Sequence, residues 1–140
     1  MPIKMLIMAK RRPDLTPEQF REGYEQSHSR IAVNLFGHLW TSYSRNYLVE
    51  GLRFKAVGTG WTGGPADLHY DVISEYIFRD AEAVEELGRI ALDHIEMIKE
   101  DEALWFDQEN SWSVTCETVD EDLTAHKPPL RRWADVPASD

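Results

Sequence analysis

The sequence has a single cysteine, no long hydrophobic run and no excess of positive charge. Because Cys116 is the one cysteine in 140 residues, no disulfide can form within the chain, which fits a reducing compartment. No stretch approaches the roughly 20 apolar residues that a membrane-spanning helix needs. The apolar run Ile3–Ala9, followed closely by basic residues, is too short for a signal peptide. We therefore predict a cytoplasmic protein without a membrane segment.

The balance of charge argues against two classes of partner. The chain has 25 acidic and 15 basic residues, which makes its net charge −10 at pH 7. Nucleic acids and anionic membrane surfaces both bind positively charged faces. We therefore predict neither nucleic acid nor membrane as a partner. Aromatic residues make up 11% of the chain, which is enough for a core or for an aromatic-lined pocket.

The motifs of common cofactor and metal enzymes are also missing. No Lys-Ser or Lys-Thr follows the glycines between Gly51 and Gly64, so they do not form a phosphate loop. No Gly-x-Gly-x-x-Gly opens a helix, and no Gly-x-Ser-x-Gly elbow occurs. Four histidines besides His28 do not fall at metal-ligand spacings: His38, His69, His94 and His126. We therefore predict no metal site and no cofactor.

Hydrophobic periodicity predicts the element order strand, helix, strand, strand, helix, strand. We expect strands over 3–9, 39–49, 70–78 and 112–118, helices over 17–36 and 81–92, and a shorter helical segment over 94–105. The first helix begins at a capping box formed by Thr16 and Gln19, with Pro17 at its first position, and ends at Gly37. Asp80 is expected to cap the second helix.

This order is that of the ferredoxin-like βαββαβ unit, an α+β fold with a four-stranded antiparallel sheet and both helices on one face. We predict one such domain over 1–118, with a long loop over 51–69, and a C-terminal arm over 119–140. The chain offers no third layer for the other face of the sheet. We therefore predict a homodimer that packs sheet against sheet.

The first predicted helix has a tyrosine and a histidine on its apolar stripe. At about 100° per residue, its stripe residues fall within roughly 80° of arc: Phe20, Tyr24, His28, Ile31 and Leu35. His28 is a candidate acid or base, because imidazole titrates near neutral pH. The alternative is that the core satisfies His28 and that Tyr24 simply packs. A cavity that touches His28 would favour the first interpretation.

Two predicted strands contribute further polar candidates. Tyr43, Arg45 and Tyr47 share one face of the second strand, because side chains alternate along a strand. Asp71 and Glu75 share one face of the third strand, where carboxylates need partners. They either orient His28 or hold substrate, or they form structural ion pairs, for example with Arg45.

Six segments, taken in order, resemble the EthD family of dimeric α/β-barrel proteins: Ile3–Leu6, Leu15–Phe20, Tyr24–His28, Tyr43–Tyr47, Tyr70–Glu75 and Asp101–Asp107. The resemblance covers about Ile3 to Thr118. It implies a dimer in which each subunit holds a pocket between sheet and helices. The sequence departs from the family pattern at Ser29–Ile31, where a proline is usual, and in its long loop over 51–69.

The resemblance also implies a small cofactor-independent enzyme that acts on hydrophobic, often aromatic or polyketide-derived, molecules. By this resemblance His28 is the acid or base, Tyr24 and Tyr43 are hydroxyl positions, and Asp71 and Glu75 are strand carboxylates. We expect the substrate-binding residues to be Trp40, Arg45, Trp61, Trp105 and Phe106.

Three functions remain open at the level of sequence. The first is a lyase or isomerase (a dehydratase, decarboxylase or lactone isomerase) in which His28 moves a proton next to a carbonyl. The second is a cofactor-free monooxygenase that deprotonates a phenol or anthrone before it reacts with oxygen. The third is a non-catalytic module that binds a small molecule.

Overall fold

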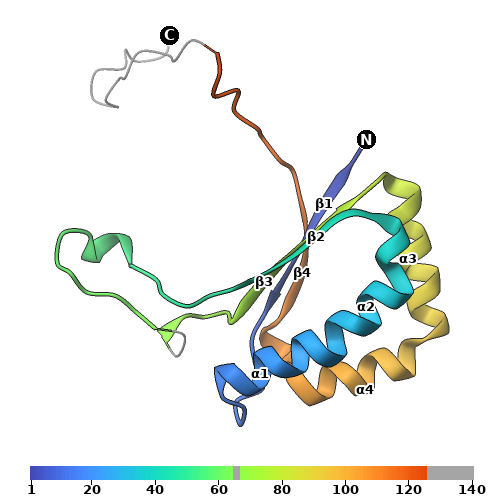
Figure 1. The fold of residues 1–140 in the computed structure, drawn as a ribbon, viewed down its shortest axis with the longest axis horizontal. Helices are drawn as coiled ribbons and strands as arrows, with labels where there is room; N and C mark the ends of the chain where they lie inside the picture. The colour runs from blue at the N-terminus through green and yellow to red at the C-terminus, as the bar shows by residue number, and fades with distance from the viewer. Residues whose placement is uncertain (65–66, 126–140) are drawn as a thin grey trace.

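The computed structural model describes residues 1–64 and 67–125 (Figure 1). Its sheet consists of β1 (Ile3–Ala9), β2 (Trp40–Tyr47), β3 (Val72–Phe78) and β4 (Trp112–Cys116). The strands lie in the order β2-β3-β1-β4, and every neighbouring pair is antiparallel. This is the predicted ferredoxin-like topology. The predicted C-terminal arm over 119–140 lies outside the described residues from position 126 onward.

The helices cover one face of this sheet, as Figure 1 shows. They are α1 (Pro17–Gly23), α2 (Ser29–Phe36), α3 (Ala81–Asp93) and α4 (Ile95–Trp105). The predicted capping box is present: Thr16 accepts from the backbone N–H of Gln19, and the Gln19 side chain accepts from the backbone N–H of Thr16. Asp80 caps α3 through the backbone N–H of Ala83 at 2.9 Å, as predicted.

The first predicted helix is not continuous. A π-helical turn over Tyr24–His28 joins α1 to α2. Such a turn widens the helix by one residue and frees a backbone carbonyl. The buried Ser29 hydroxyl donates to the carbonyl of Glu25 at 2.8 Å and satisfies it. Hydrophobic periodicity averages over several turns, so a single extra residue left no signal in the sequence pattern.

The core has two centres under the helices. One contains Ala32, Phe36, Leu39, Tyr76, Phe78 and Ala83, and the other contains Ala9, Phe20, Tyr24, Val72 and Phe106. Ile7 packs against both. The space between the helices and the sheet beside Ile7 holds the site described below.

The remaining segments lie outside this core. The second strand ends at Tyr47 and the third begins at Val72, so both are shorter than predicted. The loop between them contains a 3₁₀ turn over Phe54–Ala56 and a bridge from Gly51 to Gly63, and it extends away from the sheet (Figure 1). No helix within the described residues is both long and apolar enough to cross a membrane.

Candidate functional site

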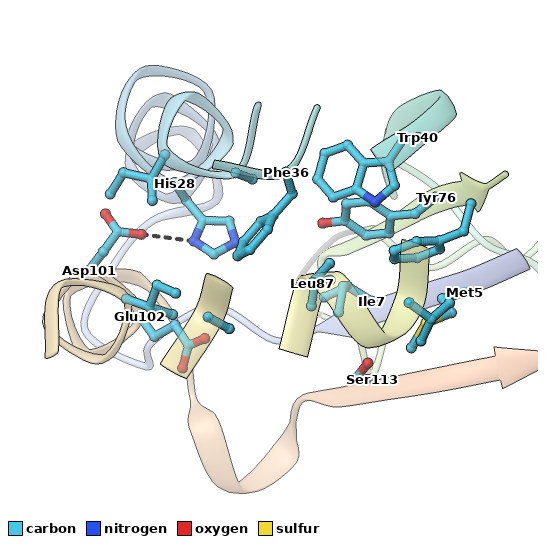
Figure 2. Close-up of a pocket in the computed structure, with 16 residues that line it drawn as sticks. Met5, Ile7, His28, Phe36, Trp40, Tyr76, Leu87, Asp101, Glu102 and Ser113 are labelled. Carbon is cyan, nitrogen blue, oxygen red and sulfur yellow. Dashed lines mark hydrogen bonds and ion pairs between the residues drawn. The ribbon is translucent and has the colours of Figure 1, made fainter. Parts of the chain in front are cut away.

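A cavity of about 310 Å³ lies between the helices and the sheet (Figure 2). This volume is at the small end of the range for ligand pockets. All four strands and helices α2, α3 and α4 contribute to its walls, which are mostly apolar and include Ile7, Ile31, Phe36, Trp40, Leu87 and Ile98. Its polar lining residues are His28, Tyr76, Asp101, Glu102 and Ser113.

His28 is the last residue of the π-helical turn and lines this cavity. Its Nδ1 lies 2.8 Å from Oδ2 of Asp101. Figure 2 shows the second ring nitrogen on the side of Phe36, away from Asp101. The imidazole is therefore held by a carboxylate at one nitrogen and faces the cavity with the other. His28 is therefore not a histidine enclosed by tight core packing, which was the alternative interpretation of the sequence.

Asp101 is buried in α4 and accepts three hydrogen bonds. His28 bonds to Oδ2, while the Ser27 hydroxyl and the Trp105 indole N–H donate to Oδ1 at 2.6 and 3.1 Å. Burial alone would raise the pKa of Asp101, but these hydrogen bonds outweigh it and lower the pKa. An ionised carboxylate can only accept. Nδ1 of His28 therefore carries a proton and donates it to Asp101, which leaves Nε2 for another partner.

Asp101 had no predicted role, although its position in the sequence carries a signal. Ile98, Asp101 and Trp105 are spaced three and four residues apart, which places them on one face of a helix. An acidic residue on such a face needs a partner. The neighbouring Glu100 and Glu102 made the segment look like a solvated acidic face, and this hid the signal.

The two tyrosines implied by the resemblance do not line the cavity. Tyr24 is fully buried beneath His28, with ring centroids 4.9 Å apart, and its hydroxyl lies 2.7 Å from Oγ of Ser74. Burial raises the pKa of Tyr24, so it remains a neutral phenol that supports the imidazole. The hydroxyl of Tyr43 is buried behind the wall. The tyrosine that does line the cavity is Tyr76.

The two strand carboxylates form structural ion pairs away from His28. Asp71 is buried and accepts from the backbone N–H of Arg11 at 2.8 Å and from its Nε at 3.1 Å. Glu75 lies on the opposite face of the sheet, where it pairs with Lys4 at 3.1 Å. The position that orients His28 is occupied by Asp101 instead.

Neither strand carboxylate pairs with Arg45, the example of a partner given above. Arg45 binds Glu25 through two nitrogens, at 2.5 and 2.7 Å, and the Tyr47 hydroxyl donates to the same carboxylate. Hydrogen bonds from Arg45 and then Tyr47 outweigh the effect of burial and lower the pKa of Glu25 to about 2. Arg45 thus anchors the π-helical turn to β2 and does not line the cavity.

The predicted aromatic wall is divided among several places. Trp40 lines the cavity. Phe106 packs on the His28 ring, with ring centroids 4.8 Å apart, and lines a smaller hollow of about 180 Å³ that His28 also borders. Trp105 packs on Gly23, and its indole N–H donates a hydrogen bond to Asp101. It therefore positions the His28–Asp101 pair and does not form part of the cavity wall. Trp61 is 46% exposed on the loop and lies outside the cavity.

The fold and the site together define a class: a ferredoxin-like α+β protein with an apolar cavity between sheet and helices and a histidine–aspartate pair on its wall. The family model of the EthD domain matches residues 12–109. This chain belongs to the EthD family. The predicted family is thereby confirmed.

Several solved structures share this fold. An EthD-like protein from Ralstonia eutropha has a TM-score of 0.58 at 16% identity, with 89% of this chain and 97% of that chain covered. An EthD family protein from Bacillus halodurans has a TM-score of 0.57 at 15% identity, with coverages of 85% and 100%. A protein from Arabidopsis thaliana has a TM-score of 0.52 at 15% identity, with coverages of 86% and 99%. None of the curated proteins matches the sequence.

Proposed function

We propose that this protein is a cofactor-independent lyase or isomerase that moves a proton next to the carbonyl of a small hydrophobic, aromatic or polyketide-derived compound. The observation that carries the proposal is the His28–Asp101 pair, with one imidazole nitrogen held by a buried carboxylate and the other facing an apolar cavity. A positioned imidazole of this kind is a general base that becomes a general acid once protonated.

The proposed reaction begins when Nε2 of His28 removes a proton from the carbon beside the carbonyl. The electron pair left on carbon moves into the carbonyl and forms an enolate. Asp101 stabilises the imidazolium that results, because the carboxylate accepts from Nδ1 at 2.8 Å. Return of the proton to another carbon completes an isomerisation, and departure of a neighbouring leaving group completes an elimination.

The cavity walls support this chemistry because they are mostly apolar. Apolar side chains from the sheet and from three helices line the cavity that His28 also lines, among them Ile31, Phe36 and Ile98. In such surroundings the charge of the imidazolium and of the enolate interact more strongly than they would in water. A substrate with an already acidic proton is required, since acid–base catalysis alone supplies about 10²–10⁴ in rate.

Proton exchange in D₂O tests the proposal without knowledge of the natural substrate. The probe is 2-tetralone, a neutral bicyclic ketone whose protons between ring and carbonyl are acidic. We expect the folded protein to accelerate loss of these proton signals in NMR spectra, relative to the same concentration of urea-unfolded chain. Binding of the probe without acceleration would contradict catalysis and indicate a non-catalytic binding module.

Oxygen consumption separates the two enzymatic hypotheses. In the proposed reaction, exchange proceeds at the same rate with and without dissolved oxygen, because no electron leaves the substrate. Oxygen uptake by the protein with a phenol or an anthrone would instead favour a cofactor-free monooxygenase at the same cavity.

We also propose that a second copy of the chain covers the face of the sheet opposite the helices. That face carries apolar side chains that are only partly buried: Leu6, Met8, Ile73, Ile77 and Val114. Burying such a surface is favourable at about 25 cal/mol per Å². We expect light scattering to give twice the mass of the chain. Replacing Ile73 with lysine should yield the mass of a monomer, and a monomeric wild-type protein would contradict the proposal.

A further inference from the structure

A second hollow lies at the base of the loop between β2 and β3. Its volume is about 480 Å³, which is within the range of small-molecule sites. Residues from both sides of the loop line it together with Lys10, which directly follows β1. It shares no lining residue with the cavity at His28. The proposed reaction therefore makes no use of this hollow.

Two glycines bring the sides of the loop close together around the hollow. Gly51 and Gly63 exchange two backbone hydrogen bonds, at 2.8 and 2.7 Å. A Cβ at position 51 would lie 2.6 Å from Cδ2 of Leu68, and one at position 63 would lie 3.3 Å from Cη2 of Trp61. Since glycine has no side chain, the Leu68 side chain and the Trp61 indole can both approach the backbone here. The hollow thus has an apolar wall that is fixed by packing.

The charge on the wall is opposite in sign to that of the whole protein. The chain has a net charge of −10, yet Lys10 and Arg53 both line the hollow. The ammonium of Lys10 donates to the carbonyl of His69 at 3.3 Å and has two further N–H donors. None of the ion pairs between described residues involves Lys10 or Arg53. Both cations therefore remain available to an anion in the hollow.

The other lining groups indicate which anion fits. Asp67 is the one acidic residue on the wall, and its Oδ2 already accepts from the backbone N–H of Gly64 at 3.1 Å. A guanidinium such as that of Arg53 binds a carboxylate through two parallel hydrogen bonds, which an ammonium cannot do. The indole of Trp61 is 46% exposed and offers its face to a flat apolar ring. The wall thus combines a carboxylate-binding part with an aromatic one.

We propose that this hollow is a binding site for a small aromatic carboxylate. The carboxylate lies between Lys10 and Arg53, and the ring packs against Trp61. Because most of the surface of an acidic protein repels anions, a cationic hollow on it concentrates them at one place. The site is separate from the cavity at His28 and does not depend on the proposed function.

Binding of two naphthalene compounds tests the inference. They are the anion 2-naphthoate and the neutral 2-naphthylmethanol, which has the same ring system. The readout is the NMR signal of the Trp61 indole N–H, identified by its absence from Trp61→Phe, so binding elsewhere is not counted. We expect 2-naphthoate to shift this signal saturably, with at least about tenfold higher affinity than the alcohol. Its affinity should fall as salt is added, because salt screens exposed charges.

Two charge-removing variants assign the anion to its partners. Lys10→Gln and Arg53→Gln should each weaken the binding of 2-naphthoate by about fivefold and leave the affinity for the alcohol unchanged. The matched control is Lys55→Gln, which removes the same charge from the same loop but outside the hollow. It should bind as the wild type does, and so should His28→Gln.

Three results would overturn the proposal. The first is that 2-naphthoate produces no saturable shift of the Trp61 signal. The second is equal affinity for the carboxylate and the alcohol. The third is an equal loss of affinity in Lys55→Gln and Arg53→Gln, which would indicate attraction by general surface charge and not a site. Loss of binding in His28→Gln would instead place the ligand in the other cavity.

Discussion

Replacing His28 with glutamine is expected to slow the exchange of 2-tetralone protons by about 10²–10⁴. Glutamine is similar in size and can still donate to Asp101, so the cavity and the helix should keep their shape. What is lost is a nitrogen that can accept a proton near neutral pH. The measurement is the exchange rate at saturating protein, with folding checked by circular dichroism. Exchange at the wild-type rate would contradict the proposed chemistry.

Asp101→Asn tests whether the two residues act as a pair. The amide keeps the volume but removes the charge that stabilises the imidazolium, so the exchange rate should fall by a large part of the His28→Gln effect. Because residues that act as a unit are not additive, the double variant should be no slower than His28→Gln alone. The control is Glu100→Gln, the same carboxyl-to-amide change at the exposed preceding position of α4. A further slowing in the double variant would mean that the two residues act independently.

The pH dependence of stability is a second measurement that distinguishes Asp101→Asn from the wild type. The pKa of Asp101 is lowered in the folded protein by hydrogen bonds that outweigh the effect of burial. Its contribution to stability is therefore fully present above the ordinary aspartate pKa and is lost as the pH falls through the lowered value. Asp101→Asn should accordingly be less sensitive than the wild type to acid in this range.

Replacing Gly23 with alanine is expected to destabilise the protein and to disturb the site together. A Cβ at this position would overlap Cε3 of Trp105, at a distance that real Cβ contacts do not show. The indole must move, and its N–H holds Oδ1 of Asp101. Overpacking of this kind costs about 1–3 kcal/mol. Urea unfolding measures the loss of stability, and proton exchange measures the effect on the His28–Asp101 pair.

The chain offers a matched control for this change. Gly88 lies on the exposed side of α3, and a Cβ there would meet nothing within 4 Å. Gly88→Ala should therefore stabilise the protein, by up to about 1 kcal/mol, through helix propensity alone. If Gly23→Ala were as stable as the wild type, the close approach of Trp105 to α1 would not matter for the fold.

Much of the fold could be predicted because it depends on local patterns. The capping box at Thr16 and Gln19, the cap at Asp80 and the four strands are each encoded within a few residues. The order of these elements then leaves few ways to bury their apolar faces. The placement of His28 on the inner stripe of the first helix followed from the same periodicity.

The partners of the polar residues could not be predicted in this way. Asp71 and Glu75 share one strand face by alternation, yet one is bound by Arg11 at the end of the strand and the other pairs with Lys4 across the sheet. Tyr76 was not among the predicted site residues, although its side chain lines the cavity. The choice of cation for each carboxylate depends on distances between side chains, and these distances are set by how the strands and helices pack.

The element order, the antiparallel α+β fold and the inward-facing histidine follow from the spacing of residues close together in the chain. The contact between that histidine and Asp101, 73 positions away, depends instead on how α4 packs on the rest of the molecule. The same is true of the π-helical turn that joins α1 to α2 and of the place of Trp61 on the outer loop. Local spacing leaves several angles and registers open to α4 on the sheet, and side-chain packing, such as that of Trp105 on Gly23, selects one of them.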